Sequence, residues 1–391
     1  MKKLDIKNKI LRALTNLTKG KSKKLHEPIF KGNEKKYLSQ CIDTGYVSYK
    51  GEFVTVFEKK IIKYTRSKYA VPTINGTSAL HILLKIYKIN SNHEVLLPSI
   101  GFVAAANAVL YCNSKPNFVD SEMATLGIDP DKLRNYLSKI SKIRNQKCIN
   151  KKTGKVIKAL IAVHVFGIPC KILELKKVCK EFNLILIEDA AEAIGSFYKG
   201  KHLGLFGDSA ILSFNGNKTI TTGGGGIILT KNKKIAKTAE HLTTTAKLKH
   251  KWEYLHDQVG YNYRMTNVNA AVGCAQLENI NKILRAKRKN FSYYKKIFRS
   301  EKNFFLLDES NRSKANFWLI ALILKKPDHK LKNKVLGYLY KNGYECRPIW
   351  KPLHRLQMFK NSQRDDLSTA DKIYASVINL PSSPILNYYK S

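Results

Sequence analysis

The sequence predicts an α/β protein, with a mainly parallel sheet in a large domain and a smaller α/β domain after it. Two observations lead to this prediction. Short apolar runs alternate with amphipathic stretches, and the pattern changes to long basic helices and a few strands from about residue 279 onward. The chain has 391 residues, of which 43% are hydrophobic, so it is long enough to build a large core and a second unit.

The apolar runs are read as buried strands, in the order 94–98, 117–120, 157–167, 183–191, 208–214 and 225–230. Between them, apolar residues at helical spacing predict helices over 78–87 and 172–182. Such sheets bind ligands at the carboxyl ends of their strands. We expect a basic extension over 1–24, a large domain over 25–278 whose first residues can join the small domain, and a small domain over 279–391.

The charge balance raises two partner classes that the motifs do not support. Seventy lysines and arginines against 29 aspartates and glutamates give a net charge of +41, which suggests nucleic acid or an anionic membrane. The excess is mostly lysine spread along the chain, without an aromatic RNA-binding box, zinc-finger spacing or a basic zipper. We expect no specific nucleic-acid partner, but an attraction for anionic small molecules and a weak one for anionic membranes.

The N-terminal residues and the cysteines predict a cytoplasmic protein. Residues 2–24 carry charges throughout and lack the apolar core of a secretory signal, and no apolar run reaches the length of a membrane span. Their apolar face is short, so a solvated, frayed arm is favoured over a surface helix. The seven cysteines are scattered with no CxxC pair, which predicts reduced thiols and no thiolate metal site.

Polar and aromatic residues follow the predicted strands at three places. Asp189 ends an apolar run, where it either caps a helix or, as a buried carboxylate, needs a cationic partner such as a protonated pyridine nitrogen. Gly76, Thr77 and Ser78 begin a helix, which is an ordinary cap or a phosphate site. Phe102 follows a strand and a glycine turn, where it packs in the core or lies flat on a planar ligand.

Lys218 differs from the other lysines in its position. It follows the strand 208–214 and precedes four successive glycines, which let the backbone approach a bulky ligand and adopt positive φ. Burial favours the neutral amine, which is a nucleophile for a carbonyl carbon. A phosphate cradle, an aromatic platform, a buried aspartate and this lysine together describe a pyridoxal phosphate site. A phosphate-binding loop of the GxxxxGK[ST] type is excluded because the glycines follow the lysine.

These residues lie in motifs that resemble the DegT/DnrJ/EryC1/StrS family of sugar aminotransferases. The resemblance covers nearly the whole chain after about residue 25, with motifs that include NGTSALH, HVFGIPC, IEDAAEAIGS, SFNGNKTITTGGGG, GYNYRMTNVNAAVG and RPIWKPLH. It implies a fold type I, pyridoxal phosphate-dependent transferase that works as a homodimer with shared active sites. The stretches LHEPIFKGNEKKYL and SFNGNKTITTGGGG most resemble the LegC-type branch.

The resemblance also implies a role for individual residues. Lys218 matches the lysine that binds the cofactor covalently, Asp189 the partner of its ring nitrogen, and Phe102 the stacking aromatic. Other cofactor contacts match Glu192, near the 3′-oxygen, Gly76, Thr77, Ser78 and Ser213, at the phosphate, and Asn262, a phosphate contact from the partner subunit. Arg264, Trp350 and His354 match the substrate region, although a structural role for Trp350 and His354 stays open, and His164 is taken as structural. No metal is expected.

The implied reaction moves an amino group from L-glutamate to C4 of a UDP-linked 4-keto-6-deoxy-N-acetylhexosamine, for legionaminic acid or bacillosamine-type glycans. The same chemistry on a GDP- or dTDP-linked sugar, as in a perosamine synthase, stays open because GYVSYKG has Tyr49 and Lys50 where the LegC-type branch tends to have small or apolar residues. Residues 101–105 also read GFVAA where the family often has TFxAT, so both threonine hydroxyls are absent. A remoter alternative is a basic nucleic-acid-binding protein on a vestigial fold.

Overall fold

We describe a computed structural model of the protein, in which residues 2–390 are described. Its centre is a sheet whose strands follow the order β1-β11-β10-β7-β6-β2-β3. All pairs along this path are parallel except those that β11 makes with β1 and β10. The bounds are β1 Tyr69–Thr73, β2 His93–Pro98, β3 Lys115–Val119, β6 Val156–Val163, β7 Ile185–Asp189, β10 Ser209–Ser213 and β11 Gly226–Thr230.

The mainly parallel sheet that the sequence predicts is confirmed, and each predicted apolar run overlaps one of these strands. Strand β1 was not predicted, because Pro72 interrupts its short apolar run. Proline lacks the backbone N–H that a ladder needs, and a strand tolerates it at a sheet edge. β1 is the edge strand of the central sheet, where it pairs with β11 alone.

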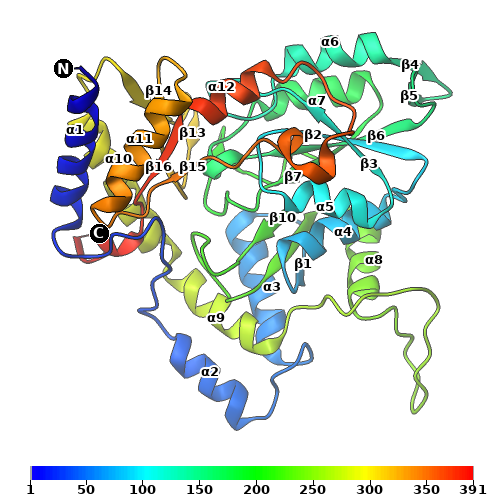
Figure 1. Ribbon diagram of the computed structural model, residues 1–391. Helices are drawn as coiled ribbons and strands as arrows, with labels where there is room; N and C mark the ends of the chain where they lie inside the picture. The colour runs from blue at the N-terminus through cyan, green and yellow to red at the C-terminus, as the bar shows by residue number, and fades with distance from the viewer. Residues whose placement is uncertain (1, 391) are drawn as a thin grey trace.

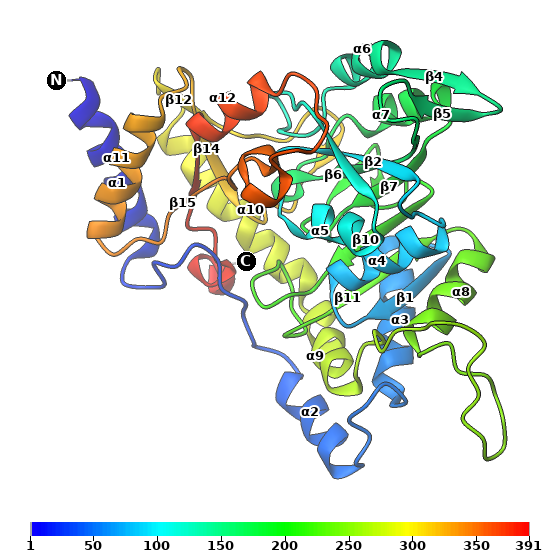
Figure 2. The same ribbon diagram turned by 45° about the vertical axis from the view of Figure 1, so that its right-hand side comes forward.

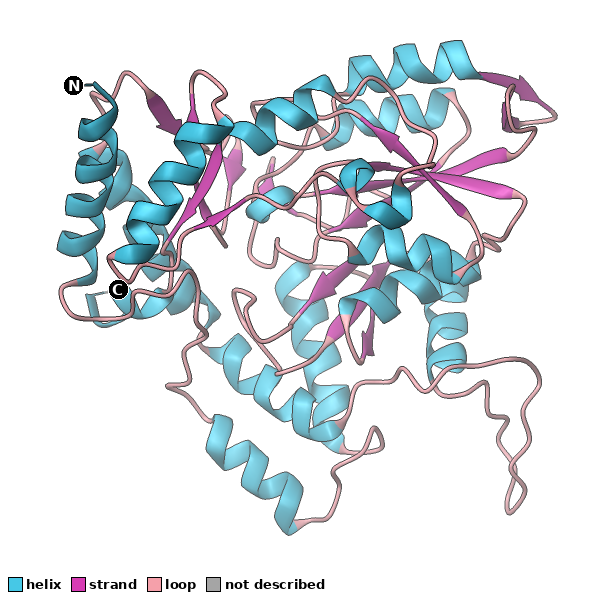
Figure 3. Cartoon of the chain, viewed as in Figure 1, coloured by secondary structure: helices cyan, strands magenta, loops and turns pink. Residues whose placement is uncertain are grey.

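Helices cover both faces of the central sheet, as Figures 1 and 3 show. Successive residues of each strand face opposite sides, so Ile161 and Val163 of β6 belong to one apolar core, and Leu160 and Ala162 to the other. The helices around the sheet are α3 Glu52–Thr65, α4 Gly76–Ile86, α5 Ala104–Tyr111, α6 Pro130–Ile140, α7 Ile172–Glu181, α8 Lys233–Thr243 and α9 Asn267–Glu278. Helix α2, Glu34–Asp43, packs on α9.

The C-terminal part of the chain forms a smaller unit around an antiparallel sheet, β12-β14-β16-β15, at the left of Figure 1. Its elements are α10 Ile280–Ile297, β12 Phe304–Leu306, β14 Ile320–Leu324, α11 His329–Lys341, β15 Arg347–Pro348, α12 Ser368–Ser376 and β16 Val377–Leu380. The hairpin of β4 Ser141–Arg144 and β5 Lys147–Asn150 extends the central sheet, because β5 pairs antiparallel with β6. A third, small sheet is formed by β8 Phe197–Tyr198, β9 Lys201–His202 and β13 Ser313–Lys314.

The prediction of a solvated N-terminal arm is wrong. Residues Lys2–Thr18 form helix α1, which lies against α10 and α11 in Figures 1 and 2. Ile10 and Leu14 are fully buried, and the side-chain oxygen of Asn8 accepts a hydrogen bond of 2.8 Å from the Tyr338 hydroxyl. The apolar face is short, but the smaller unit supplies an apolar and aromatic surface that covers it.

No helix within residues 2–390 is both long and apolar enough to cross a bilayer. All seven cysteines are buried, and none forms a disulfide. Within the same residues, no group of three or more histidine, cysteine, aspartate or glutamate side chains is placed to hold a metal ion.

Candidate active site

Lys218 lies in the loop between β10 and β11, at the end of the sheet where the parallel strands finish. Its backbone N–H donates to the carbonyl of Asn215 at 2.9 Å, which fixes the turn. The Nζ atom is 3.5 Å from Oε1 of Glu192 and lies 4.1 Å from the centre of the Trp318 ring. The side chain is 12% exposed, so this amine faces an enclosed space rather than bulk solvent.

That space is a cavity of about 330 Å³ between the carboxyl ends of the strands and the smaller unit. It brings together eight of the residues that the sequence singles out, although they come from five separate stretches of the chain. They are Gly76, Thr77, Phe102, Asp189, Glu192, Ser213, Lys218 and Trp350.

The first turn of α4 forms one wall of the cavity. Asn75 caps this helix by accepting the backbone N–H of Ser78 at 2.7 Å, which leaves the N–H groups of Gly76 and Thr77 without a helical acceptor. A Cβ on Gly76 would lie 3.1 Å from that of Ser213, so glycine keeps this edge open. Backbone N–H groups at a helix start and a serine hydroxyl suit a phosphate. Ser78 itself borders a neighbouring surface cavity of about 480 Å³.

Two carboxylates lie on the opposite wall, and burial acts on both. Desolvation raises the pKa of Asp189 against the hydrogen bond of 3.1 Å that it accepts from the Ala191 N–H. Desolvation also raises the pKa of Glu192 to about 7, although Lys218 opposes it. Glu192 is held by the backbone N–H of Phe166, which donates to its Oε2 at 2.7 Å. Phe102 is 58% exposed at the rim.

The glycine run 223–226 has a different role from the one predicted. None of its four residues lines the cavity, and only Gly223, with φ of +81°, has positive φ. A Cβ on Gly226 would lie 2.4 Å from the carbonyl carbon of Asn75, so this glycine lets β11 pass against the start of α4. Gly226 therefore lets β11 pack against the cap of α4, and within this chain none of the four glycines lines the Lys218 cavity.

Besides Ser78, three predicted residues lie outside the cavity. Arg264 faces Glu58, with Nη2 and Oε2 at 3.4 Å, and its Nη1 is buried without a hydrogen bond. The backbone of Asn262 forms an isolated antiparallel β-bridge with that of Thr244, in the loop that precedes α9. The Nδ1 atom of His354 lies 2.7 Å from the hydroxyl oxygen of Ser99. Within the described part of this one chain, the side chains of these three residues do not line the Lys218 cavity.

His164, which we took as structural, is fully buried and directly follows the last residue of β6. Its Nε2 lies 3.0 Å from Glu188, and its Nδ1 accepts the backbone N–H of Cys170 at 3.3 Å. It contacts neither Lys218 nor the cavity, so its geometry fits a structural role.

Trp318 is the main feature that the sequence did not reveal. It lies just before β14 in the smaller unit, and its indole N–H donates to the backbone carbonyl of Asn217 at 2.7 Å. Its ring covers the Lys218 amine, and it also lines a second cavity of about 560 Å³, together with Asn217 and Trp350. No motif or spacing marks Trp318, because the contact joins residues a hundred positions apart.

Comparison with known proteins agrees with this geometry. Residues 28–389 match the DegT/DnrJ/EryC1/StrS aminotransferase family. The chain belongs to this family. It is a pyridoxal phosphate-dependent sugar-nucleotide aminotransferase with a fold type I architecture.

Individual relatives place the chain within the family. A GDP-perosamine synthase of Vibrio cholerae is 36% identical over 92% of this chain and 94% of its own. A UDP-4-amino-4,6-dideoxy-N-acetyl-beta-L-altrosamine transaminase of Campylobacter jejuni is 28% identical over 86% of both. The fold is that of Helicobacter pylori PseC, an aminotransferase of pseudaminic acid biosynthesis, with a TM-score of 0.81, 24% identity and coverage of 91% of this chain and 92% of that one.

The residues of the cavity fit the cofactor that this family uses. The start of α4 suits its phosphate, and Asp189 offers a buried carboxylate to a protonated ring nitrogen. Lys218 offers the amine that a carbonyl group needs, and Phe102 offers a flat apolar face at the rim.

Proposed function

We propose that the enzyme transfers the amino group of L-glutamate to C4 of a GDP-linked 4-keto-6-deoxy sugar, for a bacterial surface glycan. The observation that carries this substrate class is the identity of 36% with a GDP-perosamine synthase over more than nine-tenths of both chains, against 28% for the UDP-sugar transaminase. A second GDP-perosamine synthase, of Escherichia coli O157:H7, is 35% identical. This choice replaces the UDP-linked, LegC-type substrate as the leading proposal.

The residue roles that we propose follow from the cavity. When bound, pyridoxal phosphate supplies an electron sink for the carbon that bears the amine. Lys218 binds the cofactor and, once released, moves a proton as a general acid and base. Asp189 keeps the proton on the ring nitrogen, and Phe102 lies against the ring. Glu192 lies next to Lys218, at 3.5 Å, where it can hold the 3′-oxygen side of the site.

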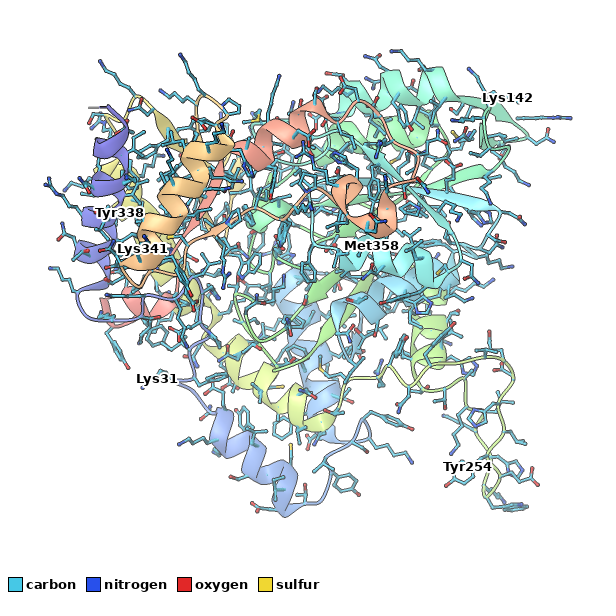
Figure 4. The ribbon with its side chains drawn as sticks, in the orientation of Figure 1. Lys31, Lys142, Tyr254, Tyr338, Lys341 and Met358 are labelled. Atoms are coloured by element: carbon cyan, nitrogen blue, oxygen red, sulfur yellow. The ribbon has the colours of Figure 1, made fainter. Side chains whose placement is uncertain are left out.

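We also propose that two copies of the chain form a homodimer that shares its active sites. Exposed apolar side chains support this proposal, because a monomer rarely leaves many of them on one projecting loop. The loop between α8 and α9 carries five of them, with Tyr254 at its outer end in Figure 4; they are Leu248, Trp252, Tyr254, Leu255 and Val259. In such a dimer Asn262 and Arg264, which lie near this loop, would reach the other copy's phosphate or substrate. We place the enzyme in the cytoplasm, where nucleotide sugars are made.

The test is spectroscopic and follows the cofactor's visible absorbance in the purified protein. Adding L-glutamate is expected to bleach the absorbance, and adding GDP-4-keto-6-deoxymannose is expected to restore it. UDP- and dTDP-linked 4-keto-6-deoxy sugars are tested in parallel as alternative substrates. Recovery with a UDP-linked sugar alone would revive the LegC-type substrate, which the 28% identity with the Campylobacter jejuni enzyme keeps as the second candidate. No absorbance at all would point to the vestigial-fold alternative.

A further inference from the structure

His26 lies in the segment between α1 and α2, where the chain crosses the face of the smaller unit. The backbone on both sides of it is fixed to the loop after β16. The carbonyl of Leu25 accepts the N–H of Ser382 at 2.8 Å, and the N–H of Glu27 donates to Oγ of Ser383 at 3.0 Å. The position of the imidazole is therefore set by two anchors and not by a free linker.

The imidazole of His26 lacks hydrogen-bond partners, as does that of the buried His81. Both of its ring nitrogens are buried without a hydrogen bond. The backbone carbonyl of Asn217, which also accepts the indole N–H of Trp318, faces the imidazole, but no hydrogen bond joins it to either ring nitrogen. By contrast, both nitrogens of His164 and of His202 are hydrogen-bonded. Leaving a buried polar group without a partner is unfavourable, so such a group at a cavity wall points to a ligand.

The cavity that His26 lines borders the cavity around Lys218. It has a volume of about 560 Å³ and shares Asn217, Trp318 and Trp350 with the cavity around Lys218. A molecule whose reacting carbon lies at Lys218 can therefore extend past the two tryptophans to His26. Glutamate is short, whereas a nucleotide sugar is long enough to occupy both spaces.

The charges around His26 determine what it can bind. Lys287 is fully buried and donates to the backbone carbonyls of Trp318 and Ser382, at 3.1 and 3.0 Å. Burial, followed by the charge of Lys287, holds the pKa of His26 well below its usual value, and Lys218 acts in the same direction. The imidazole is therefore neutral, with one N–H donor and one lone pair.

A neutral imidazole among lysines discriminates between ligand groups. A phosphate or carboxylate oxygen only accepts hydrogen bonds, so it cannot satisfy the lone pair, and Arg347 and Lys351 in the same cavity wall suit it better. A hydroxyl both donates and accepts, so it can use whichever ring nitrogen faces it. We propose that His26 is a specificity-determining residue, which binds a hydroxyl of the keto sugar and takes no part in the reaction with glutamate. This inference rests on the proposed function.

The test separates the two half-reactions by stopped-flow absorbance of the holoenzyme. His26→Phe removes both hydrogen-bonding atoms, His26→Gln keeps a donor and an acceptor, and His329→Phe, at the exposed start of α11, is the control. We expect His26→Phe to leave the glutamate rate within about twofold and to lower kcat/KM for GDP-4-keto-6-deoxymannose by about 10- to 100-fold. The glutamine variant should recover part of the loss, and the control should match the unaltered enzyme.

A substrate change identifies the hydroxyl without relying on a variant's folding. Analogues of the keto sugar that lack the C2 or the C3 hydroxyl are compared with the full sugar. In the unaltered enzyme one of these deletions should lower kcat/KM by about 10-fold or more, and in His26→Phe the same deletion should have little further effect.

The outcomes are distinguishable. Equal losses in both half-reactions would mean that His26 supports the cofactor site. An unchanged kcat/KM for the sugar would mean that His26 does not contact the sugar. Either result overturns the inference but leaves the proposed function standing. An additive cost of the substrate and protein deletions overturns it as well. If the unaltered enzyme reacts with glutamate but with no keto sugar, the proposed function fails, and the inference fails with it.

Discussion

Glu188 and Asp189 are neighbours in β7, yet their carboxylates meet opposite environments. Glu188 is fully buried, and its two oxygens are hydrogen-bonded by His164 and by the backbone N–H groups of Gly204, Phe206 and Gly207. Burial alone would raise the pKa of Glu188, but these donors hold it below its usual value.

Asp189 faces the Lys218 cavity with far fewer partners. Among the residues that the structure describes, only the Ala191 N–H donates to its carboxylate, and burial raises its pKa. The difference shows how the chain separates structure from function at this strand end. Where the protein supplies every partner, the charge is structural; where the partners are missing, a ligand with the matching group completes the site.

Lys218 gives the largest test of this distinction, because it is the cavity's only candidate to bind the cofactor covalently. We expect Lys218→Ala to lower turnover by about 10⁴-fold or more and to leave Tm within a few degrees. Steady-state assays and thermal unfolding measure the two effects. Lys171→Ala, an exposed lysine on the large domain, serves as the control. Retained turnover without added amine would contradict the assignment.

Asp189→Asn tests the incomplete carboxylate. The side chain keeps its shape and its bond from Ala191, so stability should change little, whereas the charge that holds the ring proton is lost. We expect kcat to fall by about 10²-fold or more, with the visible spectrum of the bound cofactor shifted. Parallel measurements of kcat, spectrum and Tm decide the point. A stability loss without a kcat loss would place Asp189 with Glu188 as a structural group.

Glu188→Gln is the matched opposite. The substitution brings an NH₂ group toward donors that need an acceptor and removes a buried charge, so we expect a loss of about 3–5 kcal/mol in the free energy of unfolding. The kcat of the folded fraction should stay close to that of the unaltered enzyme. Denaturant titration and kinetics on the same preparations give both numbers. If the variant is as stable as the parent, the four hydrogen-bond donors do not require a carboxylate at position 188.

Residues that lie together in the sequence were predictable, and contacts between distant segments were not. Asp189, Lys218 and the start of α4 follow strands within a few residues, so their strand-end position could be inferred from apolar runs. Trp318 and His26 reach the same region from the smaller unit and from the segment before α2, where no local pattern marks them.

The helix α1 was missed for the same reason. Its own apolar face looked too short to bind anything, and the surface that covers it, which includes Tyr293 and Tyr338, is encoded hundreds of residues later. The glycine run was misread because its tight contact is with the chain itself, at Asn75, and a sequence does not reveal which neighbour a glycine approaches.

Glu192 gives the smallest effect and a pH dependence with a definite sign. Burial raises its pKa to about 7 in the folded protein, from the usual value near 4.5, so the folded state binds more protons than the unfolded state between these values. Stability of the cofactor-free protein should therefore fall as the pH rises from about 4.5 to 7, by about 2 kcal/mol from this one group.

Glu192→Gln should flatten that slope, as chemical unfolding at several pH values would reveal. The slope belongs to Glu192 only if Glu174→Gln, a substitution of an exposed carboxylate in α7, leaves it in place. An unchanged slope in Glu192→Gln would mean that Lys218 already neutralises this carboxylate. The cavity would then hold one carboxylate that lacks its partners, Asp189, rather than two.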